Sequence, residues 1–247
     1  MDDPLSMPPA FAYMARRLAS LPAPEASPGL GAAWEARYEV HSVHREPLGA
    51  WTGGVCGGLR LRRGATAAGR FGLDVGLWLG FPGPQSDRIS AQLTCKDDGA
   101  GSLLRWRRHS QLASRSAPSL NVPVRDDGGG YSSGRLVRKP GPPLAAPPPL
   151  VPGWALFDTL RRLNSPLSFT MLEELDAVRP GQTLRPYRDA EVTMRGRAVR
   201  LRGWLQTGPG ILPTTWWLHE SGVPLLVLAG LRAYVYNPSA AMQEVTP

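Results

Sequence analysis

Apolar residues recur at every second position in three segments, as expected for strands with one buried face. Trp34, Ala36, Tyr38 and Val40 alternate with Glu35, Arg37, Glu39 and His41. Residues 71–79 repeat the pattern with Phe, Leu and Val, and residues 89–95 repeat it with Ile, Ala, Leu and Cys. The Lys96-Asp97-Asp98-Gly99 stretch is a turn signal, and a further apolar run follows it. We therefore expect antiparallel strands here, with residues 88–109 forming a hairpin.

The last sixty residues predict a meander of strands near 189–195, 198–206, 212–219, 223–229 and 231–236, separated by glycine-containing turns. Reading the strands across these turns gives one aliphatic face, made of Val199, Leu201, Leu205, Trp216, Leu218, Leu226 and Leu228. The opposite face then receives Arg200, Arg202, Trp204, Gln206, Thr215, Trp217, His219 and Tyr234.

Two segments have helical periodicity. Residues 11–21 predict a short helix, and residues 153–163 predict an amphipathic helix that begins after Pro152 and ends in an arginine pair. We expect the second helix to pack on a face of the sheet. Residues 168–178 fit a helix with a capping box or a strand equally well.

Between residues 110 and 151 the composition changes to Ser, Gly and Pro, which predicts a long loop inside the fold. The expected organisation is an N-terminal helix and tether (1–30), one curved β-sheet domain (31–237) with an internal loop at 110–152, and a flexible tail (238–247).

The order of elements after residue 150 carries a resemblance. A helix, Pro-Gly-Gln-Thr-Leu at 180–184, Thr-Gly-Pro-Gly-Ile-Leu-Pro at 207–213 and Trp-Leu-His-Glu-Ser-Gly-Val-Pro-Leu-Leu at 217–226 resemble uncharacterised bacterial domains. In those domains a curved antiparallel sheet half-wraps a helix, as in lipoprotein-carrier clamshells. The predicted fold is mainly β, a strongly curved antiparallel sheet or partly closed barrel of about nine or ten strands with one or two packed helices.

Charge and cysteine content narrow the function. The 247 residues carry a formal charge of +8, yet the basic residues occur as scattered pairs such as Arg107-Arg108, which argues against nucleic acid as the partner. The two cysteines, Cys56 and Cys95, allow one bridge, but free thiols are the simpler interpretation. No apolar run is long enough to span a membrane, and the start lacks the charges of a signal peptide, so we expect a cytoplasmic protein.

No motif predicts catalysis. Gly130-Tyr131-Ser132-Ser133-Gly134 matches the nucleophile-elbow spacing but lacks the flanking strand and helix. His41 and His44 fall on opposite sides of a strand, and no third metal ligand is indicated. A solvated face explains Glu35 and Glu39 more simply than a buried acid. We therefore predict no metal or cofactor and name no catalytic residue.

The polar face of the meander is the candidate ligand site, made of Arg200, Arg202, Trp204, Gln206, Trp217, His219 and Tyr234. Its indoles offer stacking area and its arginines suit an anionic group. Two other interpretations stay open: the 153–163 helix covers this face, or the face lies in solvent.

The leading function is a non-enzymatic binding protein for a hydrophobic or amphipathic small molecule or lipid, held in the concavity of the sheet. The alternative is a subunit that contacts a protein partner through its basic edges and the 110–152 loop. A third hypothesis is an enzyme that uses a pocket carboxylate or His219.

Overall fold

The computed structural model describes residues 7–24, 29–45, 51–80, 85–114 and 124–241. The helices are α1 (Pro9–Leu18), the short 3-10 helix η1 (Gly153–Ala155) and α2 (Leu156–Arg162). The strands of the first half are β1 (Trp34–Ser42), β2 (His44–Arg45), β3 (Trp51–Thr52), β4 (Val55–Arg63), β5 (Arg70–Gly80), β6 (Gln85–Lys96), β7 (Leu103–Ser114), β8 (Val124–Ser132) and β9 (Arg135–Lys139). The second half contains β10 (Leu144–Ala145), β11 (Leu150–Pro152), β12 (Leu167–Glu173), β13 (Ala177–Pro186), β14 (Ala190–Met194), β15 (Arg197–Thr207), β16 (Thr214–Leu218), β17 (Pro224–Ala229) and β18 (Arg232–Tyr236).

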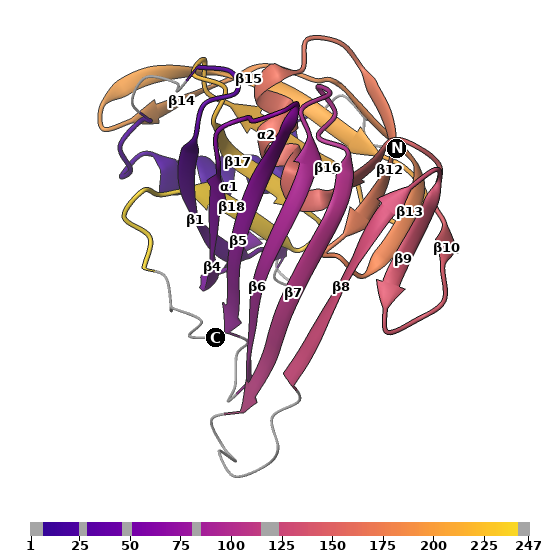
Figure 1. Ribbon diagram of the computed structural model, residues 1–247. Helices are drawn as coiled ribbons and strands as arrows, with labels where there is room; N and C mark the ends of the chain where they lie inside the picture. The colour runs from indigo at the N-terminus through magenta and orange to yellow at the C-terminus, as the bar shows by residue number, and fades with distance from the viewer. Residues whose placement is uncertain (1–6, 25–28, 46–50, 81–84, 115–123, 242–247) are drawn as a thin grey trace.

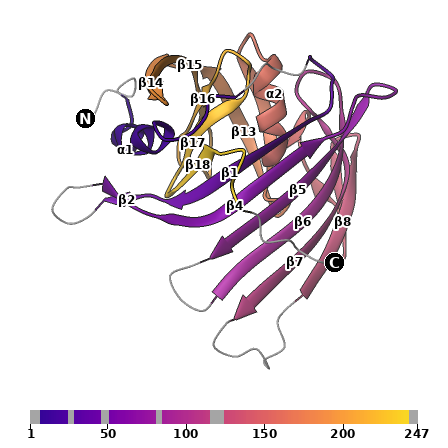
Figure 2. The same ribbon diagram turned by 90° about the vertical axis from the view of Figure 1, so that its left-hand side faces the viewer.

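One sheet of sixteen strands forms the body of the protein, and it curves around α2 (Figures 1 and 2). Its order is β10-β9-β8-β7-β6-β5-β4-β1-β18-β17-β16-β15-β13-β12-β11, with β14 paired to β15. Neighbouring strands are antiparallel except β11 and β12, which run parallel. The sheet does not close, because β10 and β11 are its two ends. The predicted fold class is confirmed, with more strands than expected.

The additional strands lie largely in the segment predicted as a loop. Residues 110–152 contain the end of β7 and all of β8 to β11, while 115–123 lie outside the described residues. The Ser, Gly and Pro content of this segment predicts a loop, but antiparallel pairing needs only the backbone. β7 pairs with β8 from Arg105↔Gly130 to Gln111↔Val124. Side-chain packing also requires a glycine in β8. A Cβ on Gly129 would lie 2.3 Å from the ring of Trp106, which is buried against the strand.

Two hydrophobic cores lie on opposite faces of the curved sheet. The larger core fills the concave side, where Phe157 and Leu160 of α2 pack against inward residues of both halves, such as Leu61, Leu93 and Trp216. The smaller core lies between α1 and the outer face of β14, β15, β17 and β18. The part of the sheet formed by β15 to β18 therefore has a hydrophobic core on each face.

A buried arginine fixes α2 inside the concavity. Arg63 of β4 is 1% exposed, and its Nε lies 3.1 Å from Oδ1 of Asp158 in α2. Asp158 also accepts a hydrogen bond of 2.9 Å from Trp34 Nε1. Because an unpaired charge at this depth is costly, these contacts hold the helix in one position. The prediction that residues 153–163 pack on a sheet face is confirmed.

The segment left open between helix and strand forms β12, a tight turn and the start of β13. Glu174 and Leu175 of this turn have φ values of 46° and 60°, and Leu175 is buried in the larger core. Arg108 of β7 donates a 2.9 Å hydrogen bond to the carbonyl oxygen of Glu174. The turn therefore reaches across the concavity and joins the two halves of the sheet.

Glu39 connects both ends of the described chain to β1. Its carboxylate receives hydrogen bonds from Arg17 of α1 and, at 2.7 Å, from Asn237 Nδ2, and it contacts His41 Nε2 at 3.0 Å. The solvated face predicted for Glu39 is wrong, because this side chain is 9% exposed, whereas Glu35 pairs with Arg37 in solvent as expected. After Asn237 the backbone N–H of Ser239 donates a 3.0 Å hydrogen bond to Asn237 Oδ1, and residues 242–247 of the predicted tail lie outside the described residues.

Cys56 is half-buried and Cys95 is buried, and both are free thiols. Burial raises the pKa of the Cys95 thiol well above its usual range. In the described part of the chain, no helix is long and apolar enough to cross a membrane.

Candidate functional site

A cleft of about 580 Å³ opens into the concave side of the sheet. We call it the interior cleft. Its walls come from η1, α2, β12 and β15 to β18, and its rim includes the β12–β13 turn and the loop at 210–212. Its lining includes Phe157, Met171, Glu173, Glu174, Arg179, Gln206, Trp216, Ala229, Arg232 and Tyr234.

The inner end of the interior cleft is aromatic. Phe157 of α2 meets Trp216 with ring centroids 5.0 Å apart and Tyr234 at 6.0 Å, both edge-to-face. Trp216 is 4% exposed, and its Nε1 has no hydrogen-bond partner among the described residues. Gln206 is also buried, and its Nε2 donates to the sulfur of Met171 at 3.2 Å, a weak acceptor. The inner end is therefore apolar but retains hydrogen-bonding capacity.

The mouth of the interior cleft is charged. Arg232 Nη1 lies 2.7 Å from Glu174 Oε1, and Arg179 Nε lies 3.0 Å from Glu173 Oε2. Tyr234 lies between this mouth and the aromatic end. Loss of hydration raises the pKa of its hydroxyl, and the nearby Glu174 adds to the increase. Tyr234 therefore stays neutral and can donate a hydrogen bond at neutral pH.

The residues predicted as a ligand site do not form one surface. Gln206 and Tyr234 line the interior cleft. Trp204 faces the same side but is buried in the larger core, and Arg202 beside it donates a 3.4 Å hydrogen bond to the carbonyl oxygen of Leu160. The 153–163 helix thus covers part of this face, as one of the open interpretations held.

The other predicted residues lie elsewhere. Arg200 is exposed and pairs with Asp189 at 2.9 Å. His219 follows β16, where its Nδ1 accepts a 3.1 Å hydrogen bond from the Ser221 backbone. Trp217 is fully buried on the outer face, where its ring lies 4.5 Å from that of Phe11 in α1.

The expected sharing of one face by Trp204 and Trp217 is wrong because the register between β15 and β16 differs from the one assumed. Trp204 pairs with Trp216, and Gly203 pairs with Trp217. Since alternate residues point to opposite faces, this register places Trp216 inward and Trp217 outward. Aromatic pairs on adjacent strands stabilise a sheet. A preference for pairing Trp204 with Trp216 could therefore have predicted this register from the sequence.

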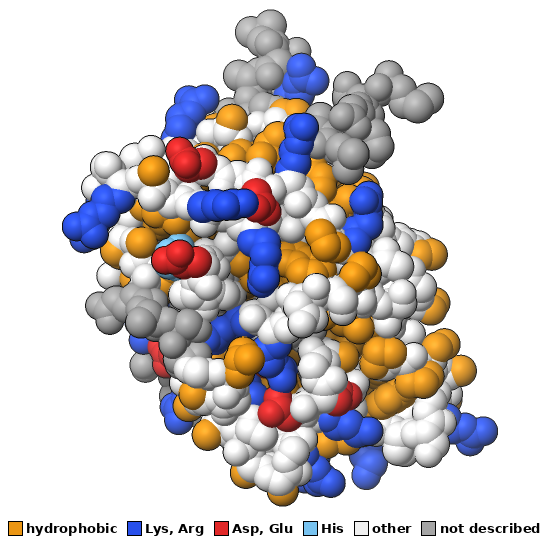
Figure 3. Space-filling view, turned by 90° about the horizontal axis from the view of Figure 1, so that it is seen from above, with side chains coloured by type: hydrophobic (Ala, Val, Ile, Leu, Met, Phe, Trp, Pro, Cys, Tyr) orange, Lys and Arg blue, Asp and Glu red, His pale blue; other side chains and the backbone are white. Residues whose placement is uncertain are grey.

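The remaining candidates from the sequence have structural explanations. Ser132 ends β8 and leads directly into β9 through a turn at Ser133 and Gly134, without a helix after it. Among the described residues, no group of three or more His, Cys, Asp and Glu side chains is placed to hold a metal. On the face seen from above, Lys and Arg side chains are spread among acidic and hydrophobic ones (Figure 3).

Comparison with known proteins gives a likeness in fold. No protein-family model matches the chain, and no curated protein matches it. A solved structure that is similar is the β-barrel-like protein of a domain of unknown function, DUF1849, from Brucella abortus. The likeness has a TM-score of 0.51 at 10% identity and covers 84% of this chain and 95% of that one. The chain therefore has the curved-sheet fold of an uncharacterised bacterial domain.

Proposed function

We propose that this protein binds an amphipathic small molecule in the interior cleft, with its apolar part against Trp216 and Phe157 and its polar end at Arg232. The observation that carries the proposal is that the lining of the cleft changes from apolar at its inner end to charged at its mouth. Buried aromatic rings form the inner end, and two ion pairs form the mouth.

The volume supports this assignment. A cleft of about 580 Å³ falls within the roughly 300–1,000 Å³ of small-molecule sites, which usually combine apolar walls with a few polar groups. The unpartnered Nε1 of Trp216 offers a donor to a ligand oxygen, and burying such a donor without a partner is unfavourable. A ligand with an acceptor near its middle would satisfy it.

The mouth favours an amphipathic ligand over a purely apolar one. Arg232 already has Glu174 as a partner, so an anionic head must displace that carboxylate, whereas an uncharged polar head need not. Replacing Glu174 by Gln leaves the arginine available. We expect Glu174→Gln to bind dodecanoate more tightly and dodecanol with unchanged affinity.

A filled-cleft variant tests the location. Ala229 is half-buried on the wall of the interior cleft, and Ala198 is exposed on the β14–β15 hairpin. Dodecanoate and dodecanol are titrated into delipidated protein by calorimetry. We expect one site, binding reduced about tenfold or more by Ala229→Phe, and no change from Ala198→Phe. Equal binding by both variants would place the site elsewhere, and no binding by the native chain would refute the proposal.

Two finer predictions belong to this proposal. The resemblance to lipoprotein-carrier clamshells supports a lipid-like ligand, because those folds also wrap a curved sheet around a helix. Native mass spectrometry of protein purified from its own host tests this by detecting a bound molecule.

The second finer prediction is a cytoplasmic location. Fractionation of cells that produce the tagged chain tests it.

A further inference from the structure

A second concavity lies on the opposite, outer face of β6 to β9. Its volume is about 1120 Å³, and it is lined by residues of four adjacent strands, whose outward side chains come from alternate positions. We call it the outer trough. The side chains that define it are Thr94, Arg105, Arg107, His109, Asp126 and Lys139. None of them belongs to the interior cleft.

The outer trough is hollow along β8. Gly128 pairs with Arg107 of β7 on one side and with Lys139 of β9 on the other, so two cationic side chains flank a position without a side chain. Adjacent strands lie about 4.8 Å apart, which separates the two flanking backbones by about 10 Å. Gly130 continues the floor beside Arg105. A slot of this width accommodates one extended chain.

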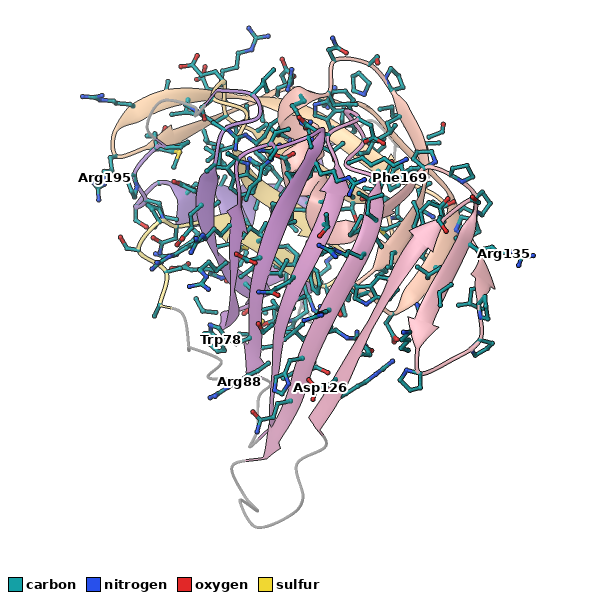
Figure 4. All side chains as sticks on the ribbon, in the orientation of Figure 1. Trp78, Arg88, Asp126, Arg135, Phe169 and Arg195 are labelled. Atoms are coloured by element: carbon teal, nitrogen blue, oxygen red, sulfur yellow. The ribbon has the colours of Figure 1, made fainter. Side chains whose placement is uncertain are left out.

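The walls of the outer trough carry cations without partners. Arg107 and Lys139 are exposed and form no ion pair with any other described residue, and Arg105 makes only a 3.2 Å hydrogen bond to Thr94. Asp126 lies toward the lower end, where it contacts His109 at 2.7 Å (Figure 4). Gly128 is therefore flanked by two cations, whereas Gly130 has Arg105 on one side and the exposed Val137 on the other.

We propose that the outer trough docks an extended acidic segment of a partner protein. The β8 backbone is already paired on both sides, so the occupant lies on the face and is held by side chains. Arg105 and Arg107 are two residues apart on one strand, a spacing of about 6.8 Å. Acidic residues at alternate positions of an extended segment have the same spacing.

The lining disfavours single-stranded nucleic acid as the occupant. Stacking of bases on aromatic side chains supplies much of that binding. Among the described residues that line the outer trough, Trp106 is the one Phe, Tyr or Trp, and it is buried beneath Gly129 on the opposite face of the sheet. The imidazole of His109 is held by Asp126 at 2.7 Å, and this carboxylate would repel a nucleic-acid phosphate.

Binding of a labelled (Glu-Ser)6 peptide, measured by fluorescence anisotropy at low salt, tests the charges. We expect Arg107→Gln with Lys139→Gln to weaken binding about five- to tenfold. The matched control is Arg195→Gln with Arg197→Gln, which removes the same charge from an exposed hairpin far from the trough (Figure 4). The control should bind within about twofold of the native chain. Equal weakening by the two pairs would show diffuse attraction and overturn the proposal.

A second pair of variants tests the shape without changing charge. Gly130→Leu fills the floor, and a Cβ there meets its nearest atom, the Leu104 carbonyl oxygen, at 3.4 Å. Gly72→Leu places the same side chain outside the trough on the same face of the sheet, 3.9 Å from its nearest atom. We expect Gly130→Leu alone to weaken peptide binding. Circular dichroism confirms that both variants fold.

Three results overturn the proposal. They are no binding of (Glu-Ser)6 by the native chain, equal binding by Gly130→Leu and Gly72→Leu, and tighter binding of a dT12 oligonucleotide that needs the same cations. Retention of peptide binding in the Ala229→Phe variant separates this site from the interior cleft.

Discussion

The two halves of the sheet bury their residues differently. In β5 to β7 one face packs on the core and the other faces solvent, so buried Leu93 lies next to exposed Gln92. In β16 every residue is buried, because α2 covers one face and α1 covers the other. Alternation of apolar and polar residues shows which face of a strand is buried only where the other face is exposed to solvent. The sequence therefore predicts the buried face correctly in β5 to β7 but not in β16.

The largest effect is expected in the covered half, where adjacent residues should be equally costly to remove. Trp216→Ala and Trp217→Ala should each lower the free energy of unfolding by about 3–5 kcal/mol, since both indoles are buried, on opposite faces. Urea denaturation followed by circular dichroism measures this. A small effect at Trp217 would mean that α1 does not cover the outer face.

In the half with one wet face, neighbouring residues should differ sharply. Leu93→Ala should cost about 2–5 kcal/mol, whereas Gln92→Ala should change stability by less than about 0.5 kcal/mol. The same urea titration provides the values. Similar losses at both positions would show that another element covers the outer face of β6.

An intermediate, pH-dependent effect concerns Glu39 of β1, which binds Arg17 of α1 and Asn237 after β18. Burial opposes its charge, but hydrogen bonds from Arg17 and Asn237 dominate and lower its pKa to about 2. The ionised form thus stabilises the fold above pH 4.5, and this contribution disappears as the pH falls toward 2.

The size of this contribution is at most about 3 kcal/mol, and nearer 1–2 kcal/mol because Arg17 is partly exposed to solvent. Glu39→Gln should therefore unfold more easily than the native chain at pH 6, and the difference should shrink between pH 4.5 and 2. Thermal melts across this range measure it. A constant difference would contradict the assigned role of the charge.

The smallest effect is expected at Arg200, outside the covered region. Its pair with Asp189 is exposed, so Arg200→Gln should change stability by less than about 0.5 kcal/mol. Dodecanoate binding should also be unchanged, because Arg200 does not line the interior cleft. If Arg200→Gln lost dodecanoate binding, Arg200 would belong to the ligand site after all.

These contrasts show how far the sequence could lead. The curved sheet, the hairpin of β6 and β7 and the packing of the 153–163 helix follow from periodicity and turns, whereas the position of α1 on the outer face does not. The register of β15 against β16 does not, because Trp216, Trp217 and Leu218 suit either face when both are buried. Gln206 and Tyr234 were correctly predicted to face a ligand site, because the alternation within each of their own strands assigns them to the inner face. Arg232 was missed because its partner, Glu174, is far away in the sequence.

The close packing around Gly129 constrains how this chain can change during evolution. Even a methyl group at residue 129 would lie 2.1 Å from the carbonyl oxygen of Val137 and 2.3 Å from the ring of Trp106. A smaller residue at 106 would remove only the second overlap, because the first is with the backbone of β9. In an alignment of true homologues, residue 129 should therefore remain glycine even where residue 106 varies, and that glycine would help to recognise relatives too distant for overall identity to reveal.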